Sequence, residues 1–246
     1  MGDILVLEEY NPDTWTYSGE AISRKVIYKL AGGFGLQDGF CVLGMGLLDT
    51  EANRPGRLRL GTAAGKENTM RYGVIRDTVA MTLPLEGDMA EIGVWRGASA
   101  AVAHGVAPHK TLHLYDTFQG VVKADSSVDV HSNGDFSDTT VETVREALGW
   151  TLDETRLVFH VGEFPSTFTE QDRKFCFVYS DTDTYFGTKA TLAIFAPRMV
   201  PGGKIMFDDY EWHGCPGVKK AITEFLIENE GIQHAIAEPR QFILTF

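Results

Sequence analysis

Short apolar runs alternate with helix-like segments through the second half of the chain. Five apolar runs bounded by Gly, Pro and Asp predict strands, at residues 89–94, 111–115, 156–161, 175–180 and 204–207. Apolar positions with helical spacing predict helices at residues 98–105, 139–148, 188–199 and 218–229. We expect Ser137 or Asp138 to cap the second of these helices. Because the strands are apolar on both faces and alternate with helices, the pattern predicts a parallel sheet covered by helices.

The chain ends in two further apolar runs, at residues 234–238 and 241–246, separated by Pro239 and Arg240. Two strands this close in sequence can pair only as a hairpin, so we expect the sheet to end in an antiparallel pair. Five parallel strands followed by such a hairpin are the order of elements expected of a methyltransferase-type Rossmann fold. A domain that binds NAD lacks the terminal hairpin.

The first part of the chain has a different pattern. It contains clusters of aromatic residues and glycine, a polar stretch at residues 54–66, and a predicted helix at residues 70–83 that leads into the first strand. We expect residues 1–70 to form a cap, a lid or a dimer arm. Residues 71–246 then form the α/β domain.

Composition restricts the class of partner and the compartment. The 246 residues include 22 Lys and Arg against 34 Asp and Glu, a formal net charge of −12, which disfavours nucleic acid and anionic membranes as partners. No apolar stretch approaches the roughly 20 residues of a membrane helix, and the first twenty residues do not resemble a secretory signal. The three cysteines lie far apart and are odd in number, which is typical of free thiols. We therefore expect a soluble cytoplasmic protein.

A turn with two glycines follows the first predicted strand. From Glu91 the sequence passes through Gly93 and Gly97 into a helix that contains Ser99. Glycine allows a ligand to approach the backbone closely, and a helix N-terminus offers free N–H groups. The spacing differs from the G-x-G-x-x-G of dinucleotide-binding folds. The turn could bind an amino-acid carboxylate or a phosphate, or it could be structural only.

A carboxylate follows the second predicted strand. Asp116 comes about twenty residues after the glycine turn, where the acidic residue of dinucleotide-binding folds accepts hydrogen bonds from the hydroxyl groups of a ribose. Phe118 could cover the face of an adenine. The alternative is that Asp116 is a solvated cap at the end of a strand.

Aspartates follow the fourth and fifth predicted strands. Because the carboxyl ends of parallel strands meet at one edge of a sheet, we expect Asp181, Asp208 and Asp209 to converge. They cannot all stay ionised without a counter-charge, and no Lys or Arg lies beside either cluster in the sequence. Ligands that are all oxygen favour Mg²⁺, and the absence of paired His or Cys argues against zinc. The alternative is that one Asp caps the helix beginning near Gly187 and that Asp209 pairs elsewhere.

Six motifs occur between residues 71 and 226. They are the glycine turn at 91–100, YDTFxG at 115–120, GDFSDT at 134–139, GEFPST at 162–167, DxDxY at 181–185 and PGGxxxxDDY at 201–210. In combination they resemble the macrocin and mycinamicin type of S-adenosylmethionine-dependent sugar O-methyltransferase. The residues before position 71 match nothing in this resemblance, which leaves the acceptor open.

The resemblance implies a class I methyltransferase fold and a Mg²⁺-dependent methyl transfer to a sugar hydroxyl of a natural product or of a nucleotide-activated sugar. It also suggests at least a homodimer. By position, it assigns the methionine portion to Glu91, Gly93, Gly97 and Ser99, the ribose to Asp116, the adenine side to Phe118, Gly162, Glu163 and Phe164, and the metal to Asp181, Asp208 and Asp209. It also counts Thr117 among the cofactor-binding residues.

Methyl transfer to an alcohol also needs a base. Asp181 could accept the proton, and two histidines are alternatives. His131 lies in a polar loop at residues 121–137 that could fold over the site, and His213 follows Asp209 closely. Two other functions remain open: a catechol-type O-methyltransferase, which a pocket of Trp and Phe would favour, and a nucleotide- or sugar-binding Rossmann protein that does not methylate.

Overall fold

The computed structural model describes residues 4–11, 16–31, 41–47, 63–149, 154–169, 171–237 and 240–246, with side chains from residue 70 onward. The chain divides into two compact units, Met1–Arg57 and Leu58–Phe246. The predicted domain boundary after residue 70 falls within helix α1 (Ala63–Thr82) of the second unit.

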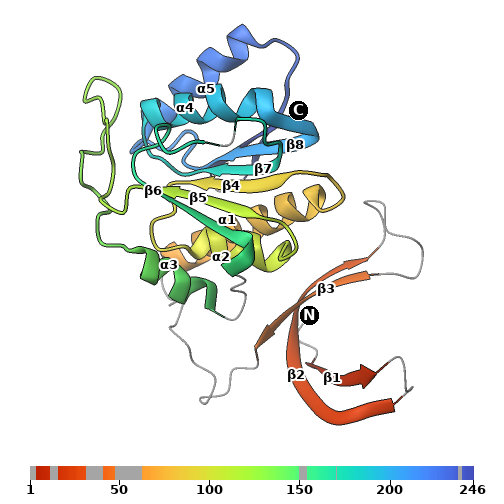
Figure 1. Ribbon diagram of the computed structural model, residues 1–246. Coiled ribbons are helices and arrows are strands. Elements are labelled where there is room, and N and C mark those ends of the chain that lie inside the picture. The colour runs from red at the N-terminus through yellow and green to blue at the C-terminus, as the bar shows by residue number, and fades with distance from the viewer. Residues whose placement is uncertain are drawn as a thin grey trace. The chain divides into compact units, whose positions relative to one another are not determined.

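The first unit contains an antiparallel sheet of three strands. They are β1 (Ile4–Asn11), β2 (Thr16–Ala31) and β3 (Cys41–Leu47), in the order β1-β2-β3. The long strand β2 lies between β1 and β3 and pairs with both (Figure 1). Each pairing contains one irregularity of register. Whether this unit acts as a cap, a lid or a dimer arm stays a prediction.

The second unit contains a sheet of seven strands in the order β6-β5-β4-β7-β8-β10-β9. They are β4 (Asp88–Ile92), β5 (Leu112–Asp116), β6 (Leu157–Val161), β7 (Phe175–Ser180), β8 (Met199–Phe207), β9 (Gln233–Ala237) and β10 (Gln241–Thr245). Strands β4 to β8 are parallel, while β10 lies between β8 and β9 and is antiparallel to both. The parallel sheet and the terminal hairpin that the sequence predicted are confirmed.

Helices cover both faces of this sheet. In addition to α1 they are α2 (Ala98–Val106), α3 (Val141–Leu148), α4 (Tyr185–Phe195) and α5 (Pro216–Glu228). Figure 1 shows α4 and α5 on one face and α1, α2 and α3 on the other. All six residues of β7 are buried, as expected for a strand covered on both sides.

The predicted starts of helices α1, α3 and α4 are wrong. Helix α1 begins at Ala63 and not at residue 70. Helix α3 is capped by Thr140, whose side chain accepts a hydrogen bond from the Thr143 N–H, and not by Ser137 or Asp138. The Asp138 carboxylate instead accepts a hydrogen bond from the Trp95 indole N–H at 2.9 Å. Helix α4 begins before residue 188, because Thr184 caps it by accepting from the Gly187 N–H at 3.1 Å. No Asp is needed as its cap.

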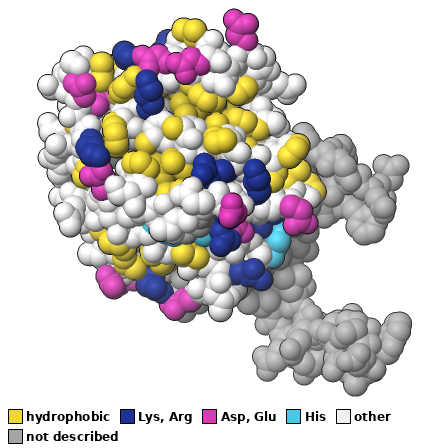
Figure 2. Space-filling model, turned by 45° about the horizontal axis from the view of Figure 1, so that its top comes forward, with side chains coloured by type: hydrophobic (Ala, Val, Ile, Leu, Met, Phe, Trp, Pro, Cys, Tyr) yellow, Lys and Arg dark blue, Asp and Glu magenta, His cyan; other side chains and the backbone are white. Residues whose placement is uncertain are grey.

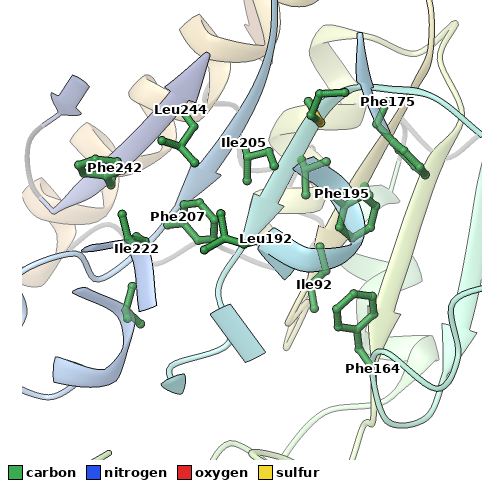
Figure 3. Packing of buried hydrophobic residues seen from close by; sticks show 14 of the residues in the cluster. Ile92, Phe164, Phe175, Leu192, Phe195, Ile205, Phe207, Ile222, Phe242 and Leu244 are labelled. Atoms are coloured by element: carbon green, nitrogen blue, oxygen red, sulfur yellow. The ribbon is translucent and has the colours of Figure 1, made fainter. Parts of the chain in front are cut away.

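The core on the α4 and α5 face is rich in aromatic side chains. Phe195 of α4 packs edge-on against Phe175 of β7, with ring centroids 4.9 Å apart, and stacks beside Phe164 at 5.9 Å (Figure 3). Burial of these rings stabilises the packing of the helix on the sheet. Phe164 also lines the cavity at the end of the sheet, so this core supports one wall of that cavity.

The surface of the described residues carries charges of both signs. On the face shown in Figure 2, acidic and basic side chains are interspersed among apolar ones. Among the described helices, none combines the length and the apolar character needed to cross a membrane. Cys176 and Cys215 are buried free thiols, whereas the side chain of Cys41 lies outside the described residues.

Candidate active site

A cavity of about 310 Å³ opens at the carboxyl ends of the parallel strands. Its walls come mainly from the segments that follow β4, β5, β7 and β8, and from Arg71 and Tyr72 of α1. The chain runs from β4 outward through β5 to β6 and then returns to β7 on the other side of β4. The cavity therefore lies where the strand order reverses, which is where ligands bind in open α/β sheets.

The glycine turn forms one wall. Gly93 has φ of +80°, and a Cβ at this position would lie 1.9 Å from the carbonyl oxygen of Asp181. Gly97 has φ of +78° and packs against Val144 of α3. A side chain at Gly93 would push the ends of β4 and β7 apart, so glycine is required there for steric reasons.

Asp116 joins this turn to the end of β5. Its Oδ2 accepts hydrogen bonds from the N–H groups of Val94 at 2.7 Å and Trp95 at 2.9 Å. Its Oδ1 accepts from the N–H of Phe118 at 2.7 Å. The carboxylate is therefore held by the backbone, and Oδ1, which accepts only one of these hydrogen bonds, retains a lone pair for a ligand hydroxyl.

Glu91 lies behind the cavity wall. It is 1% exposed and does not line the cavity. Ser99, which does line the cavity, donates its hydroxyl proton to Oε1 of Glu91 at 2.5 Å. Burial raises the pKa of Glu91 to about 8. A cation bound at this wall would favour the ionised form of Glu91.

The three predicted metal ligands do converge. One carboxylate oxygen from each of Asp181, Asp208 and Asp209 lies within 4.8 Å of the others. Tyr179 donates a hydrogen bond from its hydroxyl to Oδ2 of Asp208 at 2.8 Å. This hydrogen bond helps to orient the Asp208 side chain, which is 3% exposed.

A basic side chain contacts this cluster, contrary to the inference from sequence. Arg71 of α1 places Nη2 2.6 Å from Oδ2 of Asp181 and Nε 2.6 Å from Oδ2 of Asp208. Arg240 lies farther away, with Nε 3.9 Å from Oδ1 of Asp209. The inference was wrong because Arg71 is 110 residues before Asp181 in the chain, and only the fold brings them together.

The aspartates still carry more negative charge than Arg71 balances. Burial and the neighbouring carboxylates raise the pKa of Asp181 and that of Asp209, the latter to about 7, although Arg71 opposes both shifts. These raised pKa values mean that further positive charge would be bound favourably. Three clustered carboxylates fit the oxygen-only ligand set of Mg²⁺.

The structure places only some of the predicted residues in the cavity wall. Those that line it are Gly93, Ser99, Asp116, Thr117, Gly162, Phe164, Asp181 and Asp209. The remaining ones, outside the wall, are Glu91, Gly97, Phe118, Glu163 and Asp208. Phe118 packs against the hydrophobic core, and Glu163 forms an ion pair with Lys123.

The loop before α3 contributes to the wall of the cavity. Of the three candidate bases, Asp181, His131 and His213, only Asp181 lines the cavity. Val121, Val122 and Phe136 of the loop line it, whereas His131 does not. His213 is exposed, and its ring lies against Trp212 with centroids 5.5 Å apart.

Sequence reasoning missed several residues of the wall. Arg71 and Tyr72 carried no signal, because they belong to the helix that precedes the sheet. Trp95 lies within the glycine motif and could have been identified from it. Trp95 and Phe136, which are 44% and 42% exposed, make an edge-to-face contact with centroids 5.9 Å apart. Together they form an aromatic rim.

Comparisons with known proteins agree with this geometry. The chain is 29% identical over 169 residues to mycinamicin III 3''-O-methyltransferase of Micromonospora griseorubida; the alignment covers 62% of this chain and 65% of that protein, just under two thirds of its length. It is 32% identical over 183 residues to a tetracenomycin 4'-O-methyltransferase of Streptomyces olivaceus, covering 63% of this chain and 68% of that one. The solved structure of the O-methyltransferase NovP superimposes with a TM-score of 0.63 and 25% identity, over 72% of this chain and 79% of NovP.

Two sequence families match different parts of the chain. Residues 1–45 match a domain of unknown function, DUF3850, which falls within the first unit. Residues 62–241, more than half of the chain, match the family described as Macrocin-O-methyltransferase (TylF). The matched segment contains the glycine turn, Asp116 and the three clustered aspartates. The chain therefore belongs to the macrocin-O-methyltransferase family.

Proposed function

We propose that this protein transfers the methyl group of S-adenosylmethionine to a hydroxyl group of a small, sugar-containing acceptor, with the assistance of Mg²⁺. Membership of the family and the two curated relatives, both named as O-methyltransferases, support the reaction class. The observation that carries the proposal is the cavity itself. Its wall contains the glycine turn with Asp116 and, from neighbouring strands, Asp181 and Asp209 of the carboxylate cluster.

The donor side of the site would hold the parts of S-adenosylmethionine separately. The backbone of the glycine turn would lie close to the methionine portion, and Ser99 with Glu91 behind it would hold the ammonium group of that portion. Asp116 would accept hydrogen bonds from the ribose hydroxyls. Gly162 and Phe164 would lie on the adenine side. S-adenosylmethionine supplies an electrophilic methyl group on a sulfonium.

The acceptor side would activate and orient the hydroxyl group. Asp181, Asp208 and Asp209 would hold Mg²⁺, which supplies positive charge that favours loss of a proton from an alcohol. Asp181 would accept that proton, since it lines the cavity. The loop residues Val121 and Phe136 would reduce access of water. The transfer is an in-line displacement, so positioning of the oxygen against the methyl group decides its rate.

The test is a methyl-transfer assay with S-adenosylmethionine and a panel of glycosides and nucleotide sugars, read by mass spectrometry. We expect methylated sugar product with Mg²⁺, loss of product with EDTA, and at least a hundredfold lower rate for Asp208→Asn. Asp77→Asn, on an exposed side chain of α1, is the control that should retain activity. Full turnover with EDTA would exclude the metal, and absence of S-adenosylmethionine binding in calorimetry would exclude methyl transfer.

A second candidate acceptor is an aromatic diol, as in catechol-type O-methyltransferases. The observation that favours it is the aromatic lining of the cavity, which includes Trp95, Phe136 and Trp212. Such rings can stack on an aromatic acceptor or on the apolar face of a sugar. The same assay with catechols in the panel separates the two: turnover of catechols but not of sugars would favour the second candidate.

We further propose that residues 1–70 serve as a cap, a lid or a dimer arm, and that the protein acts as a homodimer. The separate family match for residues 1–45 supports a distinct role for this part. Light scattering of the full chain should give twice the mass of 27.2 kDa. A mass of one chain at all concentrations would contradict the dimer.

A further inference from the structure

A second group of potential metal ligands lies near the aspartate cluster. His131, Asp183 and Cys215 each offer one ligand atom, and the three atoms lie within 4.8 Å of one another. They come from three segments: the loop before α3, the turn after β7 and the residue before α5. This group offers nitrogen, oxygen and sulfur, whereas the aspartate cluster offers oxygen only.

The imidazole of His131 is oriented as in a metal ligand. Its Nδ1 lies 3.2 Å from Oδ2 of Asp135, while its Nε2 is buried and has no hydrogen-bond partner among the described residues. A histidine that binds a metal usually donates its other ring N–H to a carboxylate, which fixes the tautomer. With Asp135 as that partner, Nε2 carries the free lone pair. Phe136 and Trp212 pack beside the ring, with centroids 5.1 and 5.9 Å away.

Cys215 completes the group. It is completely buried, and its Sγ lies 3.4 Å from Oδ1 of Asp183 and 3.8 Å from Oδ2 of Asp209. Asp183 also lines the cavity, so the group adjoins the site described above. A sulfur atom, an imidazole nitrogen and a carboxylate oxygen this close together can provide three corners of a tetrahedral site.

We propose that His131, Asp183 and Cys215 form a second cation site, which adjoins the aspartate cluster but uses different ligands and is selective for Zn²⁺ over Mg²⁺. Thiolate and imidazole ligands select zinc, whereas ligand sets of oxygen alone select magnesium. The thiol proton leaves to solvent when the metal binds. Three protein ligands leave the fourth tetrahedral position for water or a bound molecule. This site does not depend on the proposed methyl transfer.

The test is a titration of the full chain with Co²⁺, a spectroscopic substitute for Zn²⁺. We expect one equivalent of Co²⁺ to produce a thiolate-to-cobalt charge-transfer band, which Zn²⁺ removes and excess Mg²⁺ does not. Cys215→Ser should abolish the band, and His131→Gln and Asp183→Asn should each lower the affinity more than tenfold. Asp135→Asn should weaken it roughly 10–100-fold, because it alters only the orientation of His131.

Two control variants identify the source of the band. Cys176→Ser removes a buried thiol of β7, whose Sγ contacts the Gly87 and Asp88 carbonyl oxygens, and should retain it. Asp208→Asn alters the aspartate cluster and should also retain it. Folding of each variant is checked by circular dichroism, and if Cys215→Ser does not fold, His131→Gln and Asp135→Asn decide. The proposal is overturned if the folded protein gives no thiolate band, if the band survives Cys215→Ser, or if His131→Gln leaves the affinity unchanged.

Discussion

Nη2 of Arg71 lies 2.6 Å from Oδ2 of Asp181, and this ion pair joins helix α1 to the end of strand β7. The same guanidinium also contacts Asp208. The three carboxylates of Asp181, Asp208 and Asp209 outnumber Arg71 and the more distant Arg240, so the fully ionised cluster would retain negative charge that a divalent cation could offset. Arg71 and a divalent cation can therefore both offset the negative charge of the aspartates. When no metal is bound, Arg71 serves as their counter-charge.

Removal of Arg71 should destabilise the metal-free protein. Arg71→Met leaves Asp181 and Asp208 without their counter-charge, and we expect a loss of about 2–4 kcal/mol in the free energy of unfolding. Mg²⁺ should restore part of this loss, because it supplies the missing charge. The measurement is urea unfolding with and without MgCl₂.

Arg76→Met is the matched control for this experiment. Arg76 is on the same helix and forms an ion pair with Asp77, whose side chain is 46% exposed. Exposed ion pairs contribute little to stability, so the free energy of unfolding of the control should fall by less than about 1 kcal/mol. Mg²⁺ should not change it. Equal losses for the two variants would show that Arg71 does not serve as the counter-charge of the cluster.

Glu91 should make the stability depend on pH. Its pKa is about 8 in the folded chain, against 4.5 for an ordinary Glu, so between these values the folded state holds a proton that the unfolded state has lost. Stability then falls as pH rises, by roughly 1.4 kcal/mol per pH unit. Glu91→Gln keeps an oxygen for Ser99 and removes this slope.

Urea unfolding at several pH values from 5 to 8 measures this difference. We expect Glu91→Gln to gain stability relative to the wild type as the pH rises. Glu86→Gln, on an exposed side chain of the preceding turn, controls for the loss of a negative surface charge. Parallel curves for the wild type and Glu91→Gln would contradict the prediction.

The close approach at Gly93 gives a steric prediction. Gly93→Ala would place Cβ 1.9 Å from the carbonyl oxygen of Asp181, whereas Gly134→Ala, also at positive φ, meets no atom within 4 Å. The control, Gly134→Ala, should lower the free energy of unfolding by about 1 kcal/mol because of backbone strain. Gly93→Ala should lower the free energy of unfolding by at least about 2 kcal/mol more than the control does, which is roughly the cost of overpacking. It should also weaken S-adenosylmethionine binding, measured by calorimetry. If both variants bind and unfold alike, the close approach has no consequence.

Asp116 should support the donor site through its backbone hydrogen bonds. Asp116→Asn replaces one acceptor oxygen by an N–H₂ group that faces N–H donors, which we expect to weaken S-adenosylmethionine binding by about 1–3 kcal/mol. Asp125→Asn is the control, since Asp125 accepts from the Ser127 N–H in an exposed turn. Unchanged affinity of the Asp116 variant in calorimetry would remove Asp116 from the donor site.

The fold of the second unit was largely predictable because its signals are local, whereas the three-stranded sheet of the first unit was not predicted. Apolar runs on both faces of β7, the short connection between β9 and β10, and the alternation of strand and helix each follow from neighbouring residues. One error arose where a distant side chain intervened. Asp138 does not cap α3, because Trp95 from the glycine turn occupies its carboxylate.

The sequence by itself determined which functional residues follow each strand: a glycine turn after β4, Asp116 after β5, and aspartates after β7 and β8. This was possible because parallel strands end at one edge of a sheet, so position along the chain predicts position in space. Only the tertiary structure decided which charges meet there. Arg71 reaches Asp181, and His131 reaches Cys215, through the packing of segments far apart in the chain, and such contacts leave no pattern in the sequence.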